Sequence, residues 1–80
     1  MLYFYINIYL GGMFMISYVG LEEVLREHQK DRNYLHDHLG LSWTTIAKFK
    51  KGESVSLSIL ERICIEFNCN IEDIVKIKRP

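Results

Sequence analysis

The sequence has few of the residues that build catalytic or metal centres. Its 80 residues include two cysteines, three histidines and one proline. It contains no Ser-His-Asp or Cys-His pattern and no glycine-rich phosphate loop, so we expect neither an enzyme nor a cofactor. His36 and His38 point about 200° apart on a helix, and no cysteine or carboxylate accompanies them at ligand spacing. We therefore expect no metal site.

The two cysteines, Cys64 and Cys69, lie inside or just past a predicted helix. Their five-residue separation does not place them on one helix face, so we expect no disulfide. Cys64 is expected to be a small buried apolar residue in a reducing, cytoplasmic compartment.

Charged residues are missing from the first 21 positions, and an uncharged run of this length is long enough to span a membrane. However, Gly11-Gly12 interrupts the run, and no Lys or Arg flanks its start as in a signal peptide. The abundance of Tyr, Phe and Ile favours strands instead. Membrane insertion is therefore the least favoured interpretation of this segment.

Two β-prone runs, Leu2–Leu10 and Met13–Tyr18, are separated by the two glycines, which is a hairpin signal. A second interpretation starts from Met13 and Met15, either of which would open a complete domain. Residues 1–14 are then either a β-prone extension that forms a hairpin strand or a non-native leader. The domain proper is expected at residues 15–80.

The formal net charge is zero, but its distribution is uneven. Residues 1–27 carry −2, residues 28–52 carry +3 and residues 53–80 carry −1. The central segment therefore concentrates the positive charge that phosphate contacts would need.

Apolar spacing and capping residues predict five short helices. They are expected at about Leu21–Gln29, Asp31–Leu39, Ser42–Lys51, Leu57–Asn68 and Ile71–Ile74. Inward-facing positions are expected at Leu21, Val24, Leu25 and His28, then Tyr34, Leu35 and His38, then Ile46 and Phe49, and finally Leu57, Leu60, Ile63, Cys64 and Phe67. The tail alternates as V-K-I-K, which predicts a short strand that pairs with the Met15–Tyr18 region. The fold is thus expected to be mainly α, with short terminal strands.

The segment from Asp31 to Gly52 has the pattern of a helix-turn-helix. Its first helix stops at Gly40, Ser42 caps the second helix, and no acidic residue occurs between Ser42 and Gly52. The second helix is apolar on one side and carries lysines on the other. Such a helix fits the major groove of DNA, where base edges can be distinguished.

Four motifs make the chain resemble the Cro/CI-type (XRE-like) helix-turn-helix regulators of bacteria and phages, and a compact single-domain subgroup in particular. They are M-I-S-Y at Met15, G-L-S-W-T-T-I-A-K at Gly40, K-G-E-S-V-S-L at Lys51 and L-E-R-I-C-I-E-F-N-C-N-I-E-D-I at Leu60. The resemblance covers about Met15 to Ile77 and implies a five-helix, phage-repressor-like domain. It implies a sequence-specific transcriptional regulator of repressor type whose partner is double-stranded DNA.

The resemblance also implies the residues that contact DNA. By motif position, Trp43, Thr44 and Lys48 would face bases. Arg32 would meet the DNA backbone, and Thr45, Lys50 and Lys51 are further phosphate candidates. Trp43 departs from the family, where a small or polar residue is more common. An indole makes no bidentate base contact. Trp43 is therefore expected either to cover a thymine methyl group or pack on a sugar, or to wedge between helices.

A regulator of this size is expected to bind as a homodimer, because one helix-turn-helix covers one half-site. Apolar candidates for the dimer interface are Tyr3, Tyr5 and Tyr9 in the first strands, Ile71 and Ile74 in the fifth helix, and Val75 and Ile77 in the tail. The alternative function is a protein-interaction module of the same fold, such as an antitoxin or anti-regulator, which the aromatic first eighteen residues would favour. A membrane-tethered regulator is the least favoured alternative.

Overall fold

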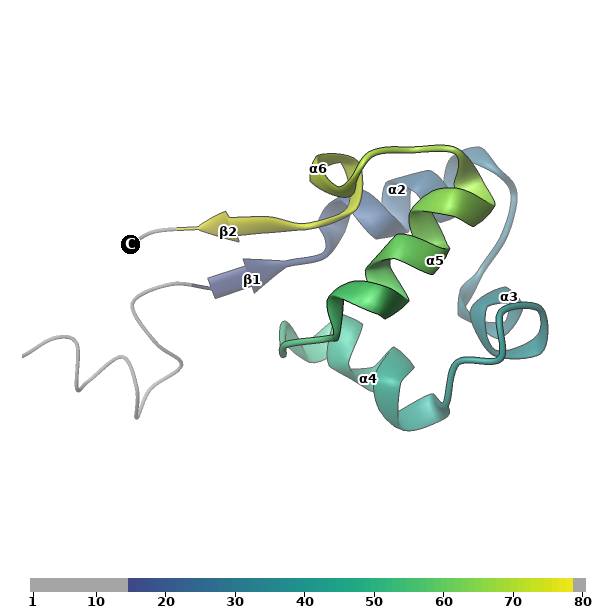
Figure 1. The fold of residues 1–80 in the computed structure, drawn as a ribbon, viewed down its shortest axis with the longest axis horizontal. Coiled ribbons are helices and arrows are strands. Elements are labelled where there is room, and N and C mark those ends of the chain that lie inside the picture. Colours follow the sequence, from purple (N-terminus) through teal and green to yellow (C-terminus); the bar gives the residue numbers. More distant parts are fainter. Residues whose placement is uncertain (1–14, 79–80) are drawn as a thin grey trace, which may run out of the picture.

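The computed structural model describes residues 15–78, and these residues form a small helical domain with a two-stranded ribbon (Figure 1). The helices are numbered from α2. The elements, in chain order, are β1 (Met15–Ser17), α2 (Val19–Glu27), α3 (Arg32–Asp37), α4 (Trp43–Lys51), α5 (Leu57–Phe67), α6 (Ile71–Ile74) and β2 (Lys76–Lys78). The expected mainly α fold of five helices and short terminal strands is confirmed. The residues assigned to the first hairpin strand and turn lie outside the described part.

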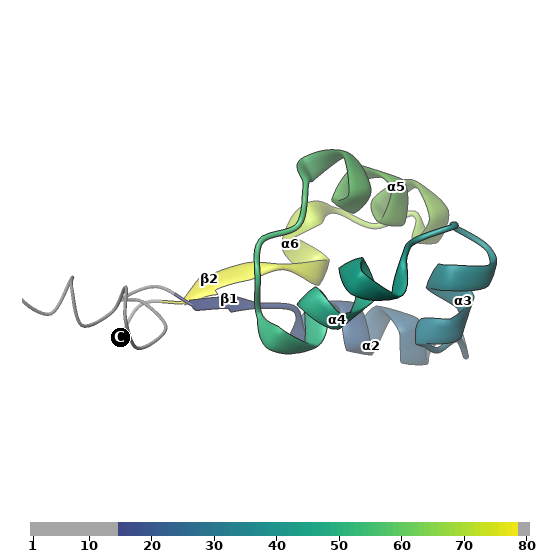
Figure 2. The ribbon, with the colours of Figure 1, turned by 90° about the horizontal axis from the view of Figure 1, so that it is seen from below.

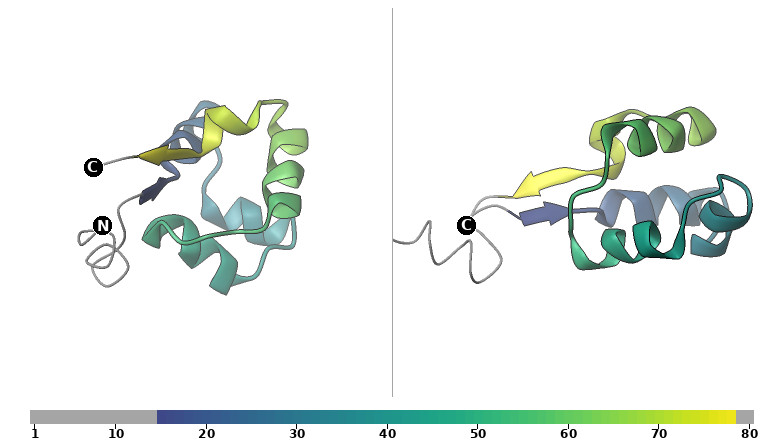
Figure 3. Two further views of the ribbon diagram at one scale, coloured as in Figure 1. Left: turned by 60° about the vertical axis from the view of Figure 1, so that its left-hand side comes forward. Right: turned by 60° about the horizontal axis from the view of Figure 1, so that its bottom comes forward.

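The two ends of the described chain meet in the ribbon, which projects from the helices (Figures 1 and 3). β1 and β2 are antiparallel, with Met15 opposite Lys78, Ile16 opposite Ile77 and Ser17 opposite Lys76. The predicted pairing of the tail with the start of the domain is therefore confirmed. Seen from below, α4, α3 and α2 lie on one side of the domain, and α5 lies on the other (Figure 2).

Short-range capping sets most helix ends. The side chains of Asp31, Ser42 and Ser56 each accept a hydrogen bond from a backbone N–H three residues later, and this confirms the cap predicted at Ser42. At the other ends, Gly40 and Gly52 adopt φ angles of +73° and +74°, which favour glycine because it has no Cβ. These two positive φ angles fix the turn before α4 and the exit after it.

The core gathers side chains from α2, α3, α4, α5 and α6. Its buried members are Tyr18, Leu21, Val24, Leu25, Leu35, Leu41, Ile46, Phe49, Leu60, Ile63, Phe67 and Ile74. Most predicted inward positions are therefore confirmed. Three were wrong. Leu57 is 69% exposed because it opens α5 ahead of the packed turns, and His28 lies past the end of α2 with its ring against Phe67. His38 is exposed at the end of α3, where its ring stacks on Tyr34.

Helix α2 begins at Val19, two residues earlier than predicted, and packs closely on α6. A Cβ on Gly20 would stand 2.0 Å from the carbonyl oxygen of Asp73. Only glycine allows this approach of the two backbones. This close approach lets α6 cover the core, where Ile74 is completely buried. Ile74 is therefore not available for the predicted dimer interface.

The cysteine geometry differs from the prediction. Asn68 ends α5 with a φ of +52°, and this turn brings the Cys69 N–H to the Cys64 carbonyl at 3.0 Å. The two thiols are consequently neighbours, although both are free. Partial burial raises the pKa of the Cys69 thiol to about 11, and the Cys64 side chain adds to the rise.

Candidate nucleic-acid interface

Helix α4 presents a polar face away from the core. Ile46 and Phe49 are buried, and Thr44, Lys48 and Lys51 lie on the opposite side, within about 60° of arc at 3.6 residues per turn. Thr44 and Lys51 are exposed, and Lys48 is half-buried. These three side chains therefore form one outward surface on a helix that contains no acidic residue.

Trp43 occupies the first position of α4 and is 50% exposed. Its indole stacks on the imidazole of His36 from α3, with ring centroids 4.3 Å apart and an interplanar angle of 22°. His36 Nδ1 is in turn hydrogen-bonded to the Leu41 carbonyl at 2.8 Å. The predicted base-contacting tryptophan is thus held on one face, and half of its surface remains open.

Thr45 does not share the outward surface. Its backbone N–H donates to Ser42 Oγ at 3.1 Å, and its own hydroxyl accepts a hydrogen bond from Ser42 Oγ at the same distance. The side chain is therefore part of the cap of α4. A phosphate that approaches this helix N-terminus would meet the half-buried Thr45 hydroxyl beside free backbone N–H groups.

Arg32 opens α3 and forms an ion pair and hydrogen bond with Glu22 of α2. The two side chains are 37% and 38% exposed, so water and salt reach the pair. Arg32 Nε is buried without a hydrogen-bond partner. The guanidinium is therefore fixed at the start of α3, where the sequence predicted a phosphate contact.

Four cationic side chains line one cleft, which we call the basic cleft. Arg32, Lys50, Lys51 and Lys78 converge there from α3, α4 and β2, and Glu22 is the single carboxylate that residues 15–78 contribute to its lining. Its volume is about 350 Å³. Three of the predicted phosphate-contacting residues are therefore brought together by the fold.

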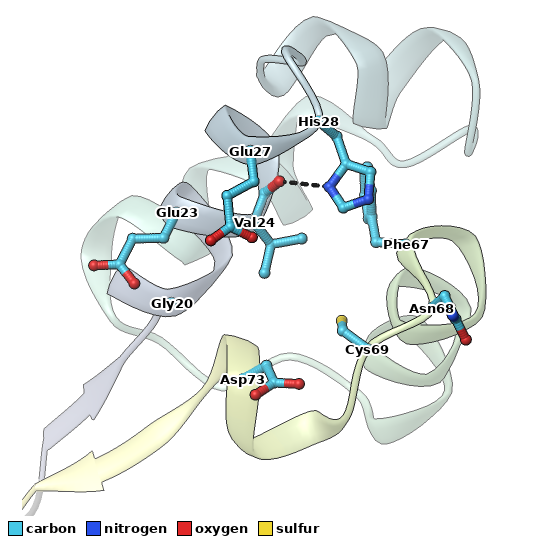
Figure 4. A pocket seen from close by; sticks show the side chains of 9 residues that line it. All are labelled: Gly20, Glu23, Val24, Glu27, His28, Phe67, Asn68, Cys69 and Asp73. Carbon is cyan, nitrogen blue, oxygen red and sulfur yellow. Dashed lines mark hydrogen bonds between the residues drawn. The ribbon is translucent and has the colours of Figure 1, made fainter.

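A second cleft has the opposite character. It lies between α2 and α6, has a volume of about 340 Å³ and contains Glu23, Glu27 and Asp73 (Figure 4). Helix α6 and helix α4 lie at opposite ends of the domain in Figure 1. A chain with no net charge thus separates its charges, and the positive side coincides with the predicted interface.

Sequence reasoning missed two residues of this region as interface candidates. His36 was considered only as a metal ligand, and Lys78 only as part of a strand. Neither has a local signal, because each acquires its neighbours through tertiary contacts. Within residues 15–78, no cluster of His, Cys, Asp and Glu has the geometry of a metal site. None of the helices of this part has the length and apolarity required to cross a membrane.

Comparison with known proteins identifies the class of the fold. The family model of the Cro/C1-type HTH DNA-binding domain matches residues 20–79. The chain therefore belongs to this family of DNA-binding domains, as its motifs predicted.

A solved structure gives the same class. The crystal structure of the transcriptional regulator VanUg, form II, is similar, with a TM-score of 0.79 and 33% sequence identity. The alignment covers 84% of this chain and 89% of that one. Comparison with curated proteins gives no match.

Proposed function

We propose that the protein is a sequence-specific transcriptional regulator that reads the major groove with α4. The observation that carries the proposal is the outward surface of Thr44, Lys48 and Lys51 beside the half-exposed Trp43. Lys48 and Thr44 are hydrogen-bond donors for base edges, and Trp43 offers an apolar surface for a thymine methyl group. Arg32, Thr45, Lys50 and Lys51 would contact phosphates.

The similarity to the transcriptional regulator VanUg supports the regulatory part of the proposal. A bound domain of this size acts most simply by covering promoter DNA, so we propose a cytoplasmic repressor. Selection of genomic fragments at low salt tests the proposal. We expect enrichment of one paired motif, and a reporter that carries this motif should be less active when the protein is present. Enrichment of no motif would overturn the proposal.

Dimerisation is the second part of the proposal. Two copies on one face of the duplex would place their recognition helices about 34 Å apart. Val75 is half-buried, but Ile71 and Ile77 are 40% and 61% exposed and remain candidates for the contact. Among residues 15–78 the sheet has two strands, so a second copy could extend it.

The dimer is tested by comparing the intact chain with two variants by light scattering and operator binding. Deletion of residues 1–12 should give a monomer if the N-terminal segment forms the contact. Ile77→Thr should give a monomer if the ribbon forms it, since threonine keeps the strand but removes apolar surface. An intact chain that stays monomeric at high concentration and on DNA would overturn the dimer.

A second candidate function rests on α5. Leu57 and Ile65 are 69% and 73% exposed on its outer side, two turns apart, which is a surface suited to another protein. A regulator that acts through a partner, such as an antitoxin, would use such a surface. Co-purification of a stoichiometric partner without retention on DNA would favour this function over direct operator reading.

A further inference from the structure

We propose that the DNA interface extends beyond the helix-turn-helix to the β-ribbon, with Lys78 as a contact to phosphates that flank the half-site. This inference rests on the proposed function and adds an element to it. Lys78 belongs to β2, far in sequence from α3 and α4, yet it lines the basic cleft with Arg32, Lys50 and Lys51.

Charge determines the occupant of the basic cleft. Four cations face one carboxylate there, and that carboxylate is already paired with Arg32. The remaining lysines, Lys50, Lys51 and Lys78, are exposed and therefore hydrated in the free protein. A cleft of this charge suits a polyanion, and double-stranded DNA carries one phosphate charge for about every 1.7 Å of its axis.

The position of the cleft selects duplex DNA among polyanions. Lys51 belongs both to the outward surface of α4 and to the basic cleft, so the two surfaces are continuous. A duplex that lies along Thr44, Lys48 and Lys51 would bring its backbone past the end of α4 to the ribbon. Helix α2 also begins in the cleft at Val19, and its N-terminal partial charge favours the same anion.

Lys76 provides a matched control on the same strand. It lies two residues from Lys78 and lines a hollow with Glu23, Glu72 and Asp73, which Lys78 also borders, and its Nζ donates to the Glu72 carbonyl at 3.0 Å. Removal of either lysine changes the net charge by the same amount. Only Lys78 lines the basic cleft.

The test measures the salt dependence of binding of the full chain to mixed-sequence duplex DNA that extends well beyond one half-site. Lys78→Ala should reduce the slope of log K against log salt by about one unit, because each neutralised phosphate contributes about 0.9. Lys76→Ala should leave the slope unchanged, and Lys78→Arg should restore it. Thermal unfolding checks that all variants fold. On a duplex trimmed to the half-site, Lys78→Ala and the parent should bind alike.

Failure of the inference and failure of the proposed function give different results. If the parent binds duplex DNA with salt dependence but Lys78→Ala has the same slope, the ribbon is not in the interface. Equal slope losses for Lys76→Ala and Lys78→Ala would indicate general charge, and would also overturn the inference. If the parent protein binds single-stranded RNA but does not bind duplex DNA at low salt, the proposed function itself fails.

Discussion

The imidazole of His36 and the indole of Trp43 are stacked face to face across the turn between α3 and α4, 4.3 Å apart. One ring comes from each helix of the helix-turn-helix, so the stack joins the two helices at the exposed side of the motif. The hydrogen bond between His36 Nδ1 and the Leu41 carbonyl sets the orientation of the imidazole. His36 therefore positions Trp43, the side chain that begins α4, which is the proposed recognition helix.

This stack gives a prediction with two matched substitutions. His36→Phe keeps a planar ring but loses the hydrogen bond to Leu41, whereas His36→Gln keeps a donor but loses the ring. We expect His36→Phe to retain the parental base preference and His36→Gln to relax it at one position, since aromatic pairs contribute about 0.5–1.5 kcal/mol. Trp43 is the only tryptophan in the sequence, so acrylamide quenching of its fluorescence reports the stack directly. Equal quenching and equal base preference in both variants would contradict a positioning role.

Thr44→Ala and Lys48→Ala should mainly change sequence preference. Contacts to bases carry discrimination, and loss of a good one costs about 1–3 kcal/mol on the preferred sequence but little on random DNA. Ser58→Ala is the matched control for Thr44, because Ser58 is also an exposed second residue of a helix, α5. Competition binding with single-base operator variants measures the effect. Equal weakening on specific and random DNA would assign the residue to phosphate or to solvent.

The Arg32–Glu22 pair predicts opposite effects of its two members. Arg32→Ala should weaken binding to all sequences and lower the salt slope by about one unit, and Lys51→Ala should do the same. Glu22→Gln should strengthen non-specific binding, because it removes the only carboxylate that the described part of the chain contributes to the basic cleft. Stability should change by less than about 1 kcal/mol, as for other solvent-exposed pairs.

Glu23→Gln is the control for this prediction. Glu23 is adjacent in sequence but lines the acidic cleft between α2 and α6. Salt titrations of DNA binding should therefore distinguish the two glutamine variants. The gain in affinity for DNA should be larger for Glu22→Gln than for Glu23→Gln. The same gain in both would mean that only net charge matters.

Two glycines predict very different stabilities after substitution by alanine. Gly40 has a φ of +73° with open space around it, so Gly40→Ala should cost only the backbone strain of about 1 kcal/mol. Gly20 lies in a helix, where alanine normally gains about 1 kcal/mol, but its Cβ would overlap the Asp73 carbonyl. We expect Gly20→Ala to cost about 3 kcal/mol because α2 and α6 must separate. Urea unfolding measures the stability of both variants. A Gly20→Ala protein that is more stable than the parent would refute the close approach of α2 and α6.

Alkaline pH should destabilise the fold through Cys69. Its pKa is raised from 9.0 to about 11 in the folded protein, so the folded state favours the neutral thiol. The resulting stability is fully present below about pH 9, the unfolded value, and is lost as pH rises through about 11. Urea unfolding under reducing conditions, with the parent compared with Cys69→Ser, isolates this contribution. An identical pH dependence of the two proteins between pH 9 and 11 would contradict it.

Much of the fold was predictable because its determinants are local. A side-chain oxygen of Ser42 or Ser56 reaches an N–H three residues later, and this requires no distant contact. The same holds for glycine at the positive φ of Gly40 and Gly52. Periodicity also located Leu35 and Ile63 in the core, since a helix in contact with others must bury one face.

The errors of prediction arise where a neighbour distant in sequence, or the end of an element, decides. Leu57 continues the stripe of α5 but is left exposed by the other residues of the 15–78 segment. Ile74 was expected at a dimer surface although α2 covers it through Gly20. Cys64 and Cys69 were separated on an ideal helix, but the left-handed turn at Asn68 brings them together. Periodicity describes a continuous helix and contains no information about where its last turn bends.

The sequence by itself determined the class of this protein: five short helices, most of them capped, a turn at Gly40 and, after that turn, a helix free of acidic residues. Tertiary structure alone decided how the side chains group on the candidate interface. It stacks His36 on Trp43, pairs Arg32 with Glu22 and brings Lys78 beside the lysines of α4. The physical reason is range: a cap acts over about one helical turn, whereas a charged cleft exists only after the packing of the core has placed separate helices and strands side by side.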